Sequence, residues 1–268
     1  MKKIIFSTLL FTIVLVAAIS VPFLLQYIKP ATQGNLPKKE VENGPPGVSS
    51  PTSSIIKISP SASQGTGSSW ILVRDLDKII LIPNFSEMLS SKEASKKNGC
   101  LELTSGGFID TERNPIGLFI SENQTFGTYK ENQTFNGFFY ITDDLRAIIS
   151  SLAPSSPTRL ALQTGPILVK NGKENILKLE RDESARRVVA GTNRQGQVVF
   201  IIFYDKSNNL LGPKLIELPK LLTKLDEETS LEIDDAINLD GGSHSAFLTS
   251  TLKISEVVAP GSFFCIKP

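Results

Sequence analysis

The chain has 268 residues, with 28 Lys plus Arg against 27 Asp plus Glu, so its formal net charge is +1. This balance creates no overall field that would hold nucleic acid, and it disfavours a dedicated DNA- or RNA-binding protein. Two cysteines and one histidine are too few for a structural zinc site with four Cys and His ligands.

The N-terminus has the pattern of a membrane segment. Lys2 and Lys3 precede a nearly uninterrupted apolar run from Ile4 to Ile28. As a helix, about 25 residues exceed a hydrocarbon core of about 30 Å. We therefore expect residues 1–30 to be a signal anchor with the two lysines in the cytoplasm, or a signal peptide cleaved near Ala18–Ser20. The rest of the chain is then membrane-anchored outside the cytoplasm, or secreted.

Residues 31–69 are rich in Pro, Gly, Ser and Thr and contain few apolar side chains. Such a composition predicts a disordered linker, because it buries too little surface to offset the entropy of ordering. Residues 70–268 remain for one folded domain of ordinary size. Cys100 and Cys265 lie near its two ends in an oxidising compartment, so they form either a disulfide or two buried free thiols.

Short β-rich runs separated by turn signals dominate the domain. The run from Val198 to Phe203 is apolar at every position, which is typical of a central strand covered on both faces. We predict an α+β fold: one domain around a mixed, strand-rich sheet with a few covering helices. The predicted strands are 71–74, 78–82, 117–121, 138–142, 160–163, 167–169, 187–191 and 198–204, and the predicted helices are 86–97, 143–152 and 219–225.

The most informative stretch is DAINLDGGSHSAFL, residues 235–248, where an apolar strand ends in Asp240, Gly241 and Gly242. Adjacent glycines let a ligand approach the backbone N–H groups closely, and the carboxylate points out of the sheet end. An ordinary Asp-Gly hairpin turn is the alternative interpretation.

Three further segments carry similar groups. They are the turn Ser105–Asp110 with Gly106 and Gly107, the turn Gln163-Thr164-Gly-Pro, and the strand that begins at Arg187. Together these segments offer carboxylates, a planar anion-binding guanidinium and loops rich in amides. A substrate that joins a sugar to a phosphate requires these groups.

His244 is the one histidine of the chain. A Ser-His-Asp hydrolase is disfavoured for two reasons. Ser243 and Ser245 each adjoin His244, and adjacent residues of a strand point to opposite faces. In addition, the sequence contains no G-x-S-x-G elbow. His244 is therefore either a substrate contact or an incidental surface residue.

The order of six segments resembles the phosphodiester glycosidase domain family over residues 98–248. The specificity lies in the ordered set, with ALQTGPILV and NLDGG the most distinctive. The segments are SGGFID, NPIGLFIS, NGFFYI, ALQTGPILVKNGK, RRVVAGTNRQGQVVFIIF and AINLDGGSHSAFL.

The resemblance implies an α+β domain that cleaves sugar-1-phosphodiesters in an extracytoplasmic glycan or envelope polymer. It implies Asp240 and Asp110 as the catalytic carboxylates, one of them facing the anomeric carbon as nucleophile or electrostatic stabiliser. No nucleotide or flavin cofactor is indicated, whereas a divalent cation such as calcium near Asp234, Asp235 and Asp240 stays open. The implied substrate- or phosphate-binding residues are Arg187, Gln163, Thr164, Ser105, Gly106, Gly107, Gly241, Gly242 and His244.

Three positions depart from the usual family residues: Ser105, Ile109 and His244. The alternative function, motivated by Ser105, Ile109 and the membrane stalk, is a non-catalytic module with the same fold that binds glycan or supports the envelope. Convergence of Asp110, Arg187 and Asp240 on one cleft favours the enzyme, whereas scattered positions favour the module.

Overall fold

The computed structural model describes residues 65–268, which belong to one compact unit. The predicted membrane segment and almost all of the predicted linker lie outside the described residues. Within residues 65–268, no helix is both long and apolar enough to cross a membrane. Strand β1 begins at Thr66, so the described fold starts before Trp70.

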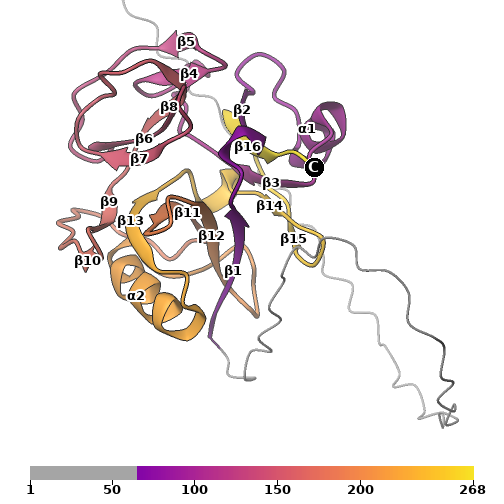
Figure 1. Cartoon of the computed structure of the whole chain (residues 1–268). Helices are drawn as coiled ribbons and strands as arrows, with labels where there is room; N and C mark the ends of the chain where they lie inside the picture. Colours follow the sequence, from indigo (N-terminus) through magenta and orange to yellow (C-terminus); the bar gives the residue numbers. More distant parts are fainter. Residues whose placement is uncertain (1–64) are drawn as a thin grey trace, which may run out of the picture. The chain divides into compact units, whose positions relative to one another are not determined.

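Within residues 65–268, sixteen strands form three sheets, and every strand pair between the named strands is antiparallel. The expectation of one mixed sheet is therefore wrong, although the strand-rich α+β character is confirmed (Figure 1). The first sheet has the order β1 (Thr66–Val73), β12 (Val198–Asp205), β11 (Arg187–Asn193), β13 (Ile233–Asn238), β9 (Ile167–Lys170) and β10 (Lys173–Glu174).

The other two sheets have five strands each. The second sheet has the order β15 (Lys253–Ile254), β14 (Phe247–Leu248), β3 (Glu102–Ser105), β16 (Ser262–Ile266) and β2 (Ile79–Pro83). The third sheet has the order β5 (Gln124–Gly127), β4 (Phe119–Ser121), β8 (Thr158–Thr164), β6 (Gly137–Thr142) and β7 (Ala147–Ser150).

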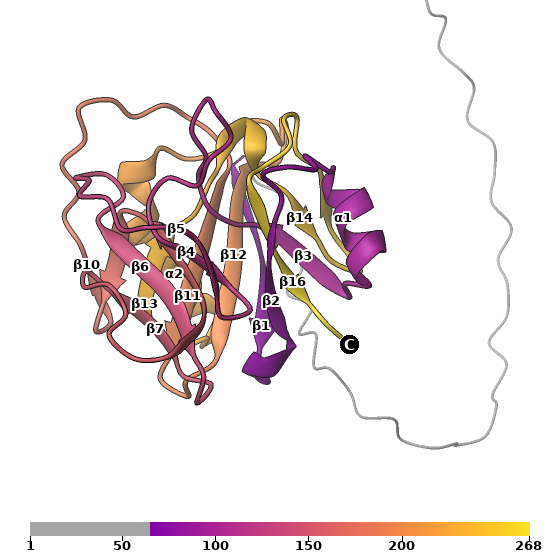
Figure 2. The same cartoon turned by 90° about the horizontal axis from the view of Figure 1, so that it is seen from above.

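Two α-helices accompany the sheets. Helix α1 (Ser91–Asn98) is shorter than predicted, because Ser90 and Glu93 form a capping box that starts the helix there. Helix α2 (Leu218–Thr229) has Pro219 in its first turn, as predicted, and extends beyond Leu225. Figure 2 shows α1 beside β3 and β16. Short 3-10 turns occur at Leu76–Lys78, Leu215–Glu217 and Gly242–His244.

The helix predicted over 143–152 is wrong. The Thr142 carbonyl accepts the N–H of Leu145 at 3.0 Å, and the Thr142 hydroxyl accepts the N–H of Arg146 at 3.1 Å. These two bonds close a hairpin turn. Leu145 has φ +57°, a left-handed conformation that an α-helix does not contain. The β-branched residues that follow pair with β6 as strand β7.

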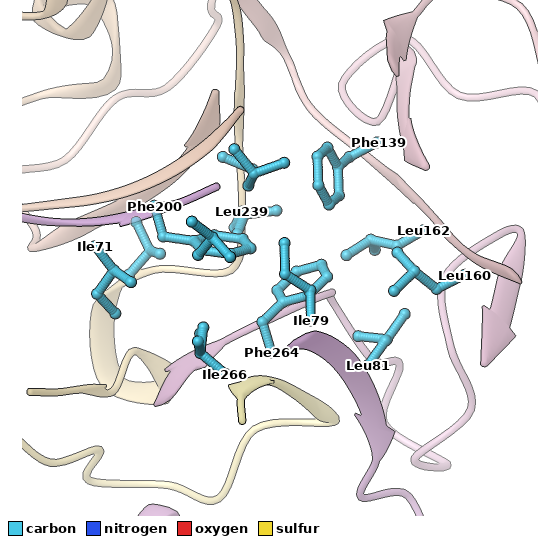
Figure 3. Close-up of a cluster of buried hydrophobic side chains, with 14 of the residues drawn as sticks. Ile71, Ile79, Leu81, Phe139, Leu160, Leu162, Phe200, Leu239, Phe264 and Ile266 are labelled. Atoms are coloured by element: carbon cyan, nitrogen blue, oxygen red, sulfur yellow. The ribbon is translucent and has the colours of Figure 1, made fainter. Parts of the chain in front are cut away.

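The first sheet is buried on both faces, as the apolar run in β12 predicts. Phe200 and Ile202 face the other two sheets, in a core that also contains Phe139 and Phe264 (Figure 3). Val199, Ile201 and Phe203 lie on the opposite face, in a cluster with the leucines of α2. This opposite face is called the helix face below.

Of the two alternatives expected for the cysteines, the disulfide is confirmed. Cys100 follows α1 and Cys265 lies in β16, and the two sulfurs are bonded. The bond ties the segment before β3 to the C-terminal strand of the second sheet, which runs beside β3.

Candidate active site

Strand β13 directs its polar end toward the helix face. Ile237 and Leu239 belong to the core between the sheets, where Figure 3 shows Leu239 near Phe200. Ala236 belongs to the opposite cluster under α2. Because strand side chains alternate, Asn238 and Asp240 point to the helix face. The backbone hydrogen bonds between β13 and β11 continue past the end of β13, since the N–H of Leu239 donates to the carbonyl of Val188 at 2.8 Å.

Asp240 is held by the end of β3. Its N–H donates to the carbonyl of Gly106 at 3.0 Å, and its own carbonyl accepts the hydroxyl of Ser105 at 3.3 Å. The residue is only 7% exposed. Burial raises the pKa of its carboxyl to about 8, and a hydrogen bond from the Gly241 N–H offsets this rise only in part. Asp240 is therefore mostly protonated at neutral pH and able to donate a proton.

Gly106 and Gly107 are fixed by Ser262 of β16. The N–H of Gly106 donates to the Ser262 carbonyl at 2.9 Å, and that of Gly107 donates to the Ser262 hydroxyl at 2.8 Å. A Cβ on Gly106 would lie 2.6 Å from that hydroxyl oxygen, so a larger residue is excluded there. Both amides are already used within the protein, and the two glycines leave room for the side chains of Ser262 and Leu162.

Thr164 and Asn238 join β8 to β13. The Thr164 hydroxyl donates to the Asn238 carbonyl at 2.7 Å, and Asn238 Nδ2 donates to the Gly165 carbonyl at 3.0 Å. The N–H of Asn238 donates to the carbonyl of Pro166 at 3.0 Å. Asn238 Oδ1 is buried and has no hydrogen-bond partner among residues 65–268. Such an acceptor is uncommon in a folded domain and is found at functional sites.

Gln163 has a different role from the one the sequence predicts. Its Oε1 accepts the N–H groups of Leu118 and Lys130, each at 3.1 Å. Its Nε2 donates to the carbonyls of Lys130 at 2.5 Å and Phe135 at 3.0 Å. The side chain thus holds the loop between β5 and β6 and has no bond left for a substrate.

The neighbouring residues Arg186 and Arg187 have different roles. Arg186 is 1% exposed and donates from Nε to the Ser245 hydroxyl at 2.5 Å and to the Gly242 carbonyl at 2.9 Å. Its Nη1 donates to the Asn209 carbonyl at 3.3 Å, and its Nη2 donates to the Ser255 carbonyl at 2.9 Å. Arg186 is not among the site residues predicted from the sequence. Strand alternation signals it, because position 186 has the parity of the inward-facing residues of β11.

Arg187 lies on the helix face beside the Asp-Gly-Gly turn. A Cβ on Gly241 would lie 3.7 Å from Arg187 Cδ. Its Nη2 forms an ion pair with Asp182 at 3.3 Å and donates to the Glu183 carbonyl at 2.6 Å. No hydrogen bond or ion pair joins Arg187 to Asp240.

The Gly241–His244 segment turns the chain away from the site. Gly242 has φ +60°, and a Cβ on Gly241 would approach the Arg186 carbonyl to 2.8 Å. His244 is partly buried, which lowers the pKa of its imidazole, and its Nδ1 lies 3.4 Å from the Ser243 hydroxyl. No hydrogen bond joins it to Asp240.

Asp110 lies in a separate, exposed turn. Its carboxylate accepts the N–H groups of Glu112 at 2.9 Å and Asn114 at 2.8 Å, and the bond from Asn114 lowers its pKa. No hydrogen bond joins Asp110 to Asp240, Arg187 or Ser105. The contacts therefore bring Ser105, Gly106 and Asp240 together, but leave Asp110 in a turn of its own.

A calcium site built from the nearby aspartates is not supported. Asp235 accepts Lys170 Nζ at 2.7 Å and the N–H of Asn171 at 2.9 Å. Among residues 65–268, no three or more His, Cys, Asp or Glu side chains are arranged to hold a metal ion. Asp234, Asp235 and Asp240 thus do not converge.

The model of the phosphodiester glycosidase family matches residues 98–262, more than half of the chain. The chain belongs to this family. The match includes every segment that carries the family resemblance in the sequence, and it extends to Ser262.

A solved structure supports the fold of this phosphodiester glycosidase domain. The zebrafish N-acetylglucosamine-1-phosphodiester alpha-N-acetylglucosaminidase catalytic domain, auto-inhibited by its pro-peptide, is 16% identical with a TM-score of 0.56. The similarity covers 78% of this chain and 85% of that one. A hypothetical protein from Synechocystis is 13% identical with a TM-score of 0.45, covering 76% and 62%. No curated protein sequence matches the chain. At 16% identity the likeness to the zebrafish domain establishes the fold alone.

Proposed function

We propose that the domain hydrolyses the bond between the anomeric carbon of a sugar and the oxygen of a phosphodiester. Membership of the phosphodiester glycosidase family supports this reaction class. The observation that carries the proposal is Asp240, a carboxyl that is 7% exposed at the end of a strand and has a pKa raised to about 8. Strongly shifted carboxyls of this kind are typical of catalytic acids.

In the proposed reaction Asp240 acts as the general acid. The C1–O bond breaks, its electron pair goes to the phosphate oxygen, and that oxygen takes the proton of Asp240. Water supplies the new C1–O bond, and the proton that it releases replaces the one Asp240 gave. Ser105 and Gly106 position Asp240 through its backbone. The products are a free sugar and a phosphomonoester.

The unpartnered Oδ1 of Asn238 supports a second role. Asn238 lies on the same face as Asp240 and two residues before it, with its backbone and Nδ2 fixed by Thr164, Gly165 and Pro166. We propose that a small movement lets Oδ1 accept a substrate hydroxyl or acetamido N–H. Asp110, which is bound within its own turn, supports the alternative of a glycan-binding or envelope-structural module.

The test is hydrolysis of UDP-N-acetylglucosamine and of an N-acetylglucosamine methyl-phosphate diester by the purified full chain. We expect release of free N-acetylglucosamine, and a loss of kcat of about 10²–10⁴-fold in Asp240→Asn, which is the usual contribution of a general acid. Release at the wild-type rate by Asp240→Asn would overturn its assignment. No release from any sugar-1-phosphodiester, with and without divalent cations, would favour the non-catalytic module.

We also propose that the domain works outside the cytoplasm. The Cys100–Cys265 disulfide supports this, because such bonds persist in oxidising compartments. The two lysines and apolar run at the N-terminus support export by an anchor or a cleaved signal. Two measurements distinguish an anchor from a cleaved signal. Cell fractionation shows whether the protein is in the membrane or the soluble fraction, and N-terminal sequencing of the mature protein shows whether cleavage has occurred.

A further inference from the structure

A cavity of about 1210 Å³ opens beside β9. It is larger than most small-molecule sites, which have volumes of about 300–1,000 Å³. One wall comes from the segment 175–181 that follows β10, and another comes from the loop before β6. None of the sequence-predicted site residues lines it.

The cavity carries cations without partners. Lys170, Lys178 and Arg181 line it, against one lining carboxylate, Glu180. Lys170 is neutralised by Asp235 at 2.7 Å. Within residues 65–268, Lys178 and Arg181 have neither an ion pair nor a side-chain hydrogen bond, so their charge is available to a ligand. Arg181 also offers the planar donor pair that matches a phosphate.

The rest of the lining combines apolar and neutral polar groups. Ile167, Leu177 and Leu215 provide apolar surface, and the Thr134 hydroxyl provides a free polar group. Asn136 lines it as well, and its Oδ1 has one weak contact, the N–H of Ile167 at 3.4 Å. Ligand sites with a few polar groups set in apolar surface follow this pattern. An organic phosphate ester suits such a lining better than a free inorganic ion does.

Two connections link the cavity to Asp240. Pro166, a lining residue, accepts the N–H of Asn238, which lies on the same face of the sheet as Asp240. On the other side, the lining residue Leu215 donates its N–H to Asp182 at 2.7 Å. Asp182 is the ion-pair partner of Arg187. Backbone hydrogen bonds and one ion pair therefore run from the cavity lining to residues on either side of Asp240.

We propose that this cavity binds the phosphate-bearing half of the substrate, with Lys178 and Arg181 contacting the phosphate. The proposal rests on the proposed hydrolysis, which leaves a phosphomonoester as its second product. Once that product has lost the proton it took from Asp240, it carries a charge of about −1.5 to −2 at neutral pH, more than the diester, so two free cations stabilise it in the cavity. Arg187 is largely occupied by Asp182 and Glu183 and is secondary in this role.

The experiment measures binding of UDP and of methyl phosphate, the products of the two assay substrates, to the full chain by calorimetry. We expect the double variant Lys178→Ala/Arg181→Ala to raise the Kd of both probes by more than about tenfold, as loss of charged hydrogen bonds does. The matched control is Arg74→Ala/Lys220→Ala, two exposed cations outside the cavity, with an expected change below about twofold. Thermal unfolding checks that both double variants fold.

The outcomes distinguish failure of the cavity proposal from failure of the proposed hydrolysis. If neither probe binds the wild type, or if both double variants weaken binding equally, the cavity proposal is wrong. The same holds if the enzyme turns over sugar-1-phosphodiesters and KM is unchanged in Lys178→Ala/Arg181→Ala, and in that case the hydrolysis stands. If binding depends on Lys178 and Arg181 but no diester is cleaved, the cavity proposal stands and the hydrolytic function fails.

Discussion

The Asp240 turn and the Asp110 turn look alike in sequence, and the fold treats them oppositely. Each has a carboxylate within three residues of a pair of glycines. Asp240 is enclosed between β3, β11 and β13, and burial raises its pKa. Asp110 is half-buried at the start of an exposed turn, and backbone N–H groups within that turn lower its pKa. The difference comes from contacts over 135 residues of sequence separation, such as that of Ser105 with Asp240, against contacts over two to four residues.

The largest expected effect is on the pH dependence of stability. Between about pH 4 and pH 8 the unfolded chain ionises Asp240, while the folded chain keeps the proton. The free energy of unfolding therefore falls as pH rises, by up to about 1.4 kcal/mol per pH unit from this residue. Asp240→Asn removes that slope, so its stability relative to the wild type is greatest near pH 8.

Urea unfolding of the wild type and Asp240→Asn at pH 5, 6.5 and 8 measures this slope. Asp110→Asn is the matched control, and we expect its stability to run parallel to that of the wild type between pH 5 and pH 8, because the pKa of Asp110 is lowered from an ordinary value that already lies below this range. The ionised Asp110 carboxylate stabilises the fold at pH values above the ordinary pKa of the group. This contribution is lost as the pH falls through the lowered pKa. Parallel pH profiles for the wild type and Asp240→Asn would show that Asp240 is ionised in the folded protein and would remove it as general acid.

The next effect concerns the two arginines beside the Asp240 turn. Arg186→Lys removes a fully buried guanidinium that bonds Gly242, Asn209, Ser245 and Ser255. The carbonyls and hydroxyl left without donors are buried, so we expect a loss of about 3–5 kcal/mol in the free energy of unfolding.

Arg187→Lys is the control for that change. It keeps the charge beside Asp182 on a side chain that is 15% exposed, and we expect a loss of about 1 kcal/mol. Urea unfolding at pH 6.5 compares the two variants. Equal losses would contradict the assignment of Arg186 as the residue that fixes the Asp-Gly-Gly turn.

Much of the fold was predictable because its signals are local. The apolar run in β12 predicts a strand covered on both faces, and Pro219 with the leucines after it predicts α2. The helix predicted over 143–152 failed because the Thr142 hydroxyl closes a hairpin turn that side-chain periodicity does not reveal. Whether one sheet or three form depends on pairings between distant strands, and no local pattern encodes these pairings.

The candidate site was predictable in its residue types but not in its roles. Gly106, Gly107 and Gly241 lie where a Cβ would meet a neighbour closely, yet the amides of Gly106, Gly107 and Gly242 bond Ser262 and Arg186 rather than standing open. Gln163 looked like a ligand contact and is a clamp for a loop. In each case a partner far away in sequence takes the hydrogen bond, so the residue type alone could not tell a structural group from a free one.

The smallest expected effect tests whether Asp110 belongs to the chemistry at all. Asp110→Asn keeps an oxygen that accepts the N–H groups of Glu112 and Asn114, so the turn survives and stability changes by less than about 1 kcal/mol. If Asp240 is the one catalytic carboxyl, kcat for sugar-1-phosphodiester hydrolysis changes by less than about threefold, which is about 0.6 kcal/mol in the barrier. A loss comparable to that of Asp240→Asn, with an unchanged melting temperature, would instead make Asp110 the second catalytic carboxylate. The exposed turn would then have to close on the substrate, because the free enzyme holds the two carboxyls without a bond between them.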